Sequence, residues 1–69
     1  MDKYEYKVRL QEIKDLIAKG EYVEAASIAD TIDWTKVKSV MMLCTISDLY
    51  KINRRLEDDR DLLLLAYNR

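Results

Sequence analysis

The chain has 69 residues, of which 49% are hydrophobic and 36% charged, and its net charge is -1 at pH 7. This balance is too apolar for a disordered tail, too charged for a membrane span and too neutral to favour nucleic acid as a partner. With one Cys and no His, the chain cannot form an internal disulfide, and we expect no metal site, no cofactor and no catalytic centre.

The first predicted helix covers about residues 3–19. Its apolar positions recur at intervals of three and four residues, which places them on one helical face: Tyr6, Leu10, Ile13 and Ile17. Gly20 follows, and glycine readily adopts the left-handed backbone conformation that ends many helices. We therefore expect the chain to reverse its direction at Gly20.

The second predicted helix covers about residues 22–32 and carries three alanines on one face. Small residues let two helix backbones approach closely, so the first two helices should form an antiparallel hairpin. Asp33 can cap the start of a third helix, because its carboxylate can accept hydrogen bonds from unpaired amides. Trp34 would then lie over the hairpin.

The third and fourth predicted helices cover about residues 35–52 and 55–68, a region with neither Gly nor Pro. Residues 52–56 can form a turn between them. Alternatively, the last two helices are fused into one helix of about 35 residues, which carries a heptad seam of leucines with Asn53 as its polar position. That seam is typical of a parallel dimer, and the sequence leaves both alternatives open.

One segment resembles a known family. Residues 20–25 match the turn Gly-x-Tyr-x-x-Ala of tetratricopeptide repeats, whose period is about 34 residues. The chain as a whole resembles two such repeats, at about 3–33 and 34–69, within one domain of residues 1–69. The resemblance implies an all-α fold of antiparallel helical hairpins that binds proteins or peptides without catalysis.

The second copy of the repeat departs from the family at its turn. Arg54 and Asp59 stand where the family has Gly and Ala. Arg54 disfavours positive φ, and Asp59 puts a carboxylate where two helices should touch. Both changes oppose a tight turn, and their clustering would suit an engineered variant.

The last helix contains four consecutive leucines, which cover a full turn, so at least one must point away from the core. Because arrays of this type usually need three or more repeats, we expect the chain to form a homodimer or a higher homo-oligomer. The predicted oligomer interface combines Asn53 with the apolar residues of the last helix: Asn53, Leu56, Leu62, Leu63, Leu64, Leu65 and Tyr67. Contacts with another protein or peptide are predicted at Tyr4, Lys7, Lys14 and Trp34.

The sequence therefore predicts a non-enzymatic module for protein–protein interaction or self-assembly through an apolar C-terminal helix. The alternative is a designed or structural oligomeric building block without a natural ligand. Cys44 has no His to activate it, and the acidic residues between Glu57 and Asp61 radiate around a helix start instead of converging on a cation. Because the N-terminus lacks the apolar stretch of a secretory signal, the expected location is the cytoplasm.

Overall fold

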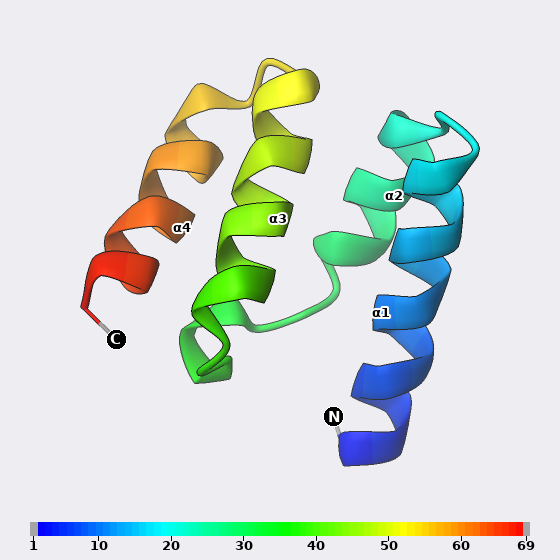
Figure 1. Ribbon diagram of the computed structural model, residues 1–69, viewed down its shortest axis with the longest axis horizontal. Coiled ribbons are helices and arrows are strands. Elements are labelled where there is room, and N and C mark those ends of the chain that lie inside the picture. The colour runs from blue at the N-terminus through cyan, green and yellow to red at the C-terminus, as the bar shows by residue number, and fades with distance from the viewer. Residues whose placement is uncertain (1, 69) are drawn as a thin grey trace. The chain divides into compact units, whose positions relative to one another are not determined.

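A computed structural model describes residues 2–68, and the regular structure in this range is entirely helical (Figure 1). The elements are α1 (Lys3–Ala18), α2 (Tyr22–Ala29), the 3-10 helix η1 (Trp34–Lys36), α3 (Val40–Ile52) and α4 (Leu56–Tyr67). The predicted all-α fold class is confirmed.

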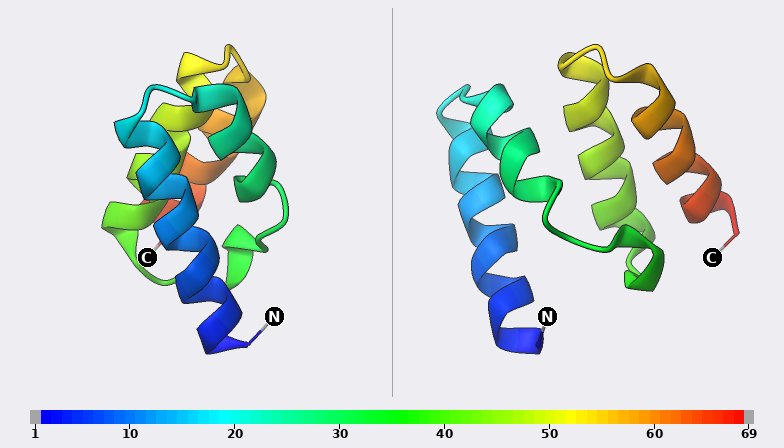
Figure 2. Two further views of the ribbon diagram at one scale, coloured as in Figure 1. Left: turned by 90° about the vertical axis from the view of Figure 1, so that its right-hand side faces the viewer. Right: turned by 180° about the vertical axis from the view of Figure 1, so that it is seen from behind.

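The chain divides into two compact units, one up to Ile32 and one from Asp33 onward. Within the first unit α2 runs back alongside α1, and within the second α4 runs back alongside α3 (Figure 2). No helix within residues 2–68 combines the length and the apolar character that crossing a membrane requires.

The first unit begins with a capped helix. The Asp2 carboxylate accepts a 2.8 Å hydrogen bond from the Glu5 backbone N–H, which satisfies one of the free amides at the start of α1. Ile13 from the predicted apolar stripe is buried, and so are the three alanines of α2. Tyr6 is half-buried, and this burial raises the pKa of its phenol above the ordinary value.

Gly20 forms the turn between α1 and α2, as predicted. Its φ of 78° lies in the left-handed region. The Gly20 N–H donates to the Ile17 carbonyl at 3.0 Å and the Glu21 N–H donates to the Leu16 carbonyl at 2.9 Å. These two bonds define a Schellman motif, which satisfies the last carbonyls of α1 as the chain reverses.

The turn between α3 and α4 has the same hydrogen bonds, although it contains no glycine. Arg54 takes the left-handed position with a φ of 61°. Its N–H donates to the Lys51 carbonyl at 2.9 Å, and the Arg55 N–H donates to the Tyr50 carbonyl at 2.8 Å. The prediction of one fused helix is therefore wrong, because α3 and α4 are separate helices joined by a Schellman turn.

Side chains around Arg54 explain why the turn forms without glycine. The Asn53 side-chain amide donates to the Leu49 carbonyl at 2.9 Å, a second hydrogen bond to a carbonyl that already accepts the Asn53 backbone N–H. The Arg55 guanidinium lies 4.4 Å from the centre of the Tyr50 ring, and its Nε donates to Asp58 at 2.8 Å. Through Arg55 these contacts link the end of α3 to the start of α4 on both sides of the turn.

Two predicted helix boundaries differ from the structure by three or more residues, and the others agree within one residue. α2 ends at Ala29 instead of residue 32, because the next amides bond to carbonyls three residues back: Thr31 to Ile28 and Ile32 to Ala29.

α3 begins at Val40 instead of residue 35, because the chain first makes the single turn η1 and then extends at Val37. Ser39 caps α3, and its hydroxyl accepts a 3.2 Å hydrogen bond from the Met42 N–H.

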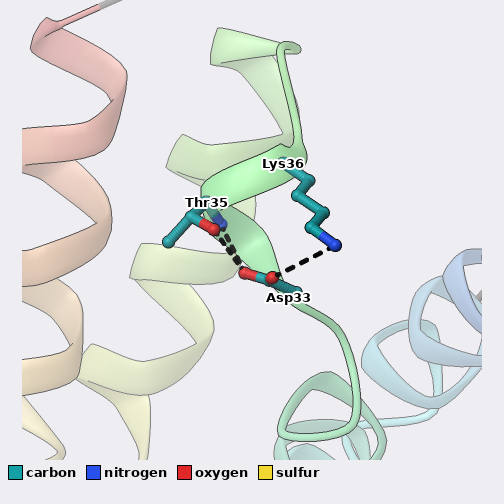
Figure 3. A network of polar contacts seen from close by, with 3 residues as sticks. All are labelled: Asp33, Thr35 and Lys36. Carbon is teal, nitrogen blue, oxygen red and sulfur yellow. Dashed lines mark hydrogen bonds and ion pairs between the residues drawn. The ribbon is translucent and has the colours of Figure 1, made fainter.

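Asp33 organises the start of the second unit (Figure 3). Its Oδ1 accepts hydrogen bonds from the Thr35 hydroxyl at 2.5 Å and from the Thr35 N–H at 3.1 Å, and its Oδ2 lies 4.0 Å from Lys36 Nζ. The Thr35 hydroxyl is the main cause that lowers the pKa of the Asp33 carboxyl below its ordinary value. Desolvation opposes this shift, whereas the Thr35 N–H and the Lys36 ammonium reinforce it.

The lowered pKa predicts how this cap responds to pH. Since the folded-state pKa of Asp33 lies below the unfolded-state pKa, its ionised form stabilises the fold above pH 4 or so, and this contribution is lost as the pH falls through the folded-state pKa. We expect Thr35→Val to raise the titration midpoint of Asp33, measured by NMR of its carboxyl carbon. Thr45→Val is the matched control, because the Thr45 hydroxyl donates to the Met41 carbonyl. An unchanged midpoint in Thr35→Val would contradict the assigned cause.

The buried residues of the second unit come mainly from α3. They include Leu43, Ile46, Leu49 and Tyr50, each at most 4% exposed, and α4 contributes Leu62. Ser47 is buried as well, and its hydroxyl donates to the Cys44 carbonyl at 3.0 Å. Because Leu49 is buried within its own chain, it is not part of a heptad seam.

Candidate interaction surface

The most apolar exposed surface of the second unit lies on α4. Four large apolar side chains share one side of this helix and are 37–86% exposed: Leu56, Leu63, Leu64 and Tyr67. Arg60 lies among them and is also exposed. We call these five residues the α4 face.

The spacing of these residues explains why they share one side. Successive helical residues are rotated by about 100°, so positions separated by four, seven, eight and eleven residues from Leu56 fall within an arc of roughly 100°. Leu62 lies on the opposite side of the helix and is 4% exposed. Since α4 packs against α3 through the Leu62 side, the α4 face points away from that contact.

The turn before α4 determines which residues face outward. The Asp59 N–H donates to the Arg55 carbonyl at 3.0 Å, so helical bonding starts directly after the Arg54 turn. Three acidic residues follow in the first turn, where negative charge stabilises a helix N-terminus: Glu57, Asp58 and Asp59. The rotation of α4, and thus the position of each leucine, follows from this start.

The structure separates the predicted interface residues into two groups. Leu56, Leu63, Leu64 and Tyr67 lie together on the α4 face, as described above. The other three lie elsewhere: Leu62 is buried, whereas Leu65 and Asn53 are half-buried. The Asn53 side chain serves the turn at the end of α3 and not a coiled-coil seam.

The predicted partner-contact residues are also divided. Tyr4 is 76% exposed, and Lys7 and Lys14 are exposed on α1. Trp34 is 7% exposed and its backbone forms the start of η1, so it presents little surface to a partner.

A shallow groove of about 450 Å³ lies within the first unit, between α1 and α2. Its apolar surface comes from Tyr4, Val8 and Ile28. Its polar lining comes from Glu5, Arg9, Glu12, Ser27 and Thr31. We call this the α1–α2 groove.

The polar residues of the groove differ in how they are bound. One Arg9 guanidinium nitrogen donates to the Thr31 hydroxyl at 2.5 Å, and that hydroxyl donates to the Ile28 carbonyl at 2.6 Å. Within residues 2–68, the carboxylates of Glu5 and Glu12 have no hydrogen-bond or ion-pair partner. The groove therefore holds one guanidinium that is already bound and two carboxylates that are free.

Val8 and Ile28, two apolar residues of the α1–α2 groove, are absent from the contact residues that the sequence predicted. Val8 could have been found, because it lies four residues after Tyr4 and therefore shares its side of α1. Ile28 joins this surface through the packing of α2 against α1, which no local spacing predicts. Arg60 lies four residues after Leu56, so the same helical spacing places it on the side of Leu56, Leu63 and Tyr67.

No described residues form a cluster of metal ligands: within residues 2–68 there is no group of three or more Cys, Asp or Glu side chains placed to hold an ion. Cys44 is a free thiol and is half-buried on α3. The acidic residues at the start of α4 lie around the helix, and one of them, Asp58, is paired with Arg55.

Comparisons of the chain with protein-family models, curated proteins and solved structures gave no match.

Proposed function

We propose that this chain is a non-enzymatic protein–protein interaction module that associates with itself through the α4 face. The observation that carries the proposal is the exposure of four large apolar side chains on one side of a short helix. Monomeric soluble proteins rarely expose large contiguous apolar patches, and where such a patch occurs it usually marks an interaction surface.

The arrangement of charge supports this assignment. Three of the four acidic residues of α4 lie in its first turn, and the α4 face carries a single charged side chain, Arg60. Protein interfaces are enriched in Arg and aromatic residues and depleted of Lys, Glu and Asp, and the α4 face has this composition. Tyr67 at 86% exposure is an aromatic residue of the type that often contributes strongly to binding.

We further propose that the two helix pairs are tetratricopeptide-like repeats. The two Schellman turns support this, since the left-handed positions Gly20 and Arg54 are 34 residues apart, which equals the family period. α2 and α4 also begin 34 residues apart, at Tyr22 and Leu56. Two repeats leave apolar surface uncovered at the last helix, which self-association would cover.

The proposal predicts a mass that rises with concentration. In sedimentation equilibrium over the micromolar to millimolar range, the wild-type chain should exceed its monomer mass of 8.2 kDa. Leu64→Glu should remain near the monomer mass. Burial of one leucine contributes about 1.5–3 kcal/mol, so its loss should weaken association by roughly ten- to a hundredfold.

The matched control is Met41→Glu. Met41 is 80% exposed and lies on α3 outside the α4 face, so the same change in charge and polarity should leave the mass distribution unaltered. Circular dichroism should report the same helix content for both variants. A wild-type chain that stays monomeric over the whole range, or a Leu64→Glu variant that associates as well as the wild type, would refute the proposal.

A further inference from the structure

We propose that the α4 face of one copy docks into the α1–α2 groove of a second copy, so that the chain assembles head to tail. This inference rests on the proposed self-association and names the surface that receives α4. A contact between two different surfaces is heterologous, and it leaves each pair of molecules with one free α4 face and one free groove. The assembly can therefore grow beyond a dimer.

The shapes of the two surfaces are suited to each other. Leu63, Leu64 and Tyr67 follow Arg60 at positions i+3, i+4 and i+7, the spacing by which an amphipathic helix binds an apolar groove. The groove lies between two helices and has three apolar side chains, Tyr4, Val8 and Ile28. Its volume of about 450 Å³ is in the range of clefts that receive side chains or ligands.

Charge favours the groove over a second α4 face as the partner. Arg60 lies near the middle of the α4 face, so in a symmetric contact between two such faces the two guanidinium groups would come close together, whether the helices run parallel or antiparallel. Bringing two like charges out of water at an apolar interface is unfavourable.

The groove offers Arg60 the opposite charge. Glu5 and Glu12 lie two helical turns apart on α1, about 10 Å along the helix axis, and Val8 lies between them. Their carboxylates are free of partners within residues 2–68, and the one guanidinium of the groove, that of Arg9, is bound to Thr31. An arginine that enters beside Val8 therefore has a carboxylate within reach on either side.

A complementation experiment tests the head-to-tail contact. Leu64→Glu impairs the α4 face and leaves the groove intact, whereas Val8→Glu impairs the groove and leaves the α4 face intact. We expect each variant alone to sediment as a monomer. An equimolar mixture should form a 1:1 dimer that does not grow further, because its two remaining surfaces are both impaired.

The control for the groove variant is Val23→Glu. Val23 is on α2, is 74% exposed and does not line the groove, so this variant should assemble like the wild type. Arg60→Glu should weaken assembly about tenfold, the effect of losing one close charge pair. Adding Glu5→Lys and Glu12→Lys to Arg60→Glu should restore assembly.

The outcomes separate the two proposals. If the wild-type chain never associates, the proposed function fails. If the wild type associates but Val8→Glu associates equally well, or if the mixture of the two variants remains monomeric, the α4 face binds something other than the groove. The head-to-tail inference is then refuted, whereas self-association through α4 stands.

Discussion

Replacing Leu62 with alanine is expected to lower the free energy of unfolding by about 2–5 kcal/mol. Leu62 is 4% exposed and is the residue through which α4 reaches the buried interior of the second unit. Truncation removes its apolar contacts and leaves a cavity that the surrounding helices fill only in part. Since a chain this short rarely has more than ~3–5 kcal/mol of stability from its core, this single change should remove most of it.

The matched control is Leu64→Ala in the same helix. Leu64 is 52% exposed, so its truncation should change the free energy of unfolding by less than about 0.5 kcal/mol. Urea unfolding followed by circular dichroism, at a dilution at which the chain is monomeric, measures both values. Equal effects of the two substitutions would contradict the rotation of α4 described above.

This pair of leucines illustrates what the sequence could and could not predict. Four consecutive leucines cover every side of a helix, so the pattern indicates that at least one is exposed without identifying it. The choice depends on where α4 starts, and α4 starts after a turn whose central residue, Arg54, opposes a turn by local propensity. If Arg54 is taken as helical instead of as a turn residue, the exposure of the leucines and the role of Asn53 are therefore predicted wrongly as well.

Local signals were sufficient to predict the turn and several buried residues of the first unit. Gly20 marks the turn, Ile13 follows the apolar periodicity, and the alanines mark the close packing of α2. All three depend on residues that are near in sequence or on one helical face, for which spacing is a direct guide.

The start of α3 required more than periodicity. Asp33 suggested an early helix start, but Asp33 and Ser39 can each cap one. Both do so in the structure, which gives η1 first and α3 second. Val40 and Met41 consequently lie on the exposed first turn of α3 and not on a buried face.

The position of Arg54 leads to the second large effect: Arg54→Gly is expected to raise the free energy of unfolding by about 0.5–1 kcal/mol. A residue with a Cβ loses roughly 1–2 kcal/mol in the left-handed conformation. Glycine avoids this loss, but its greater conformational freedom in the unfolded chain lowers the free energy of unfolding by about 0.5–1 kcal/mol. The Schellman hydrogen bonds of the turn use backbone atoms and remain available in the variant.

The reciprocal change at the first turn should have the opposite sign. Gly20→Ala is expected to lower the free energy of unfolding by about 0.5–1 kcal/mol, the backbone loss in the left-handed conformation less the gain from restricting the unfolded chain. A Cβ added at Gly20 meets no heavy atom within 4 Å, so the whole loss comes from the backbone conformation at a φ of 78°. Gly20→Asn should lose less, because asparagine tolerates the left-handed region better than alanine.

The sign of the Arg54→Gly effect distinguishes the observed turn from a continuous helix. If residues 40–67 formed one helix, glycine in its interior would lower the free energy of unfolding by about 1 kcal/mol. Arg60→Gly supplies that comparison within the same chain, since Arg60 lies in the interior of α4 and should show this loss. Arg54→Gly and Arg60→Gly should therefore shift the urea midpoint in opposite directions, and a shift in the same direction would mean that Arg54 does not form a turn in solution.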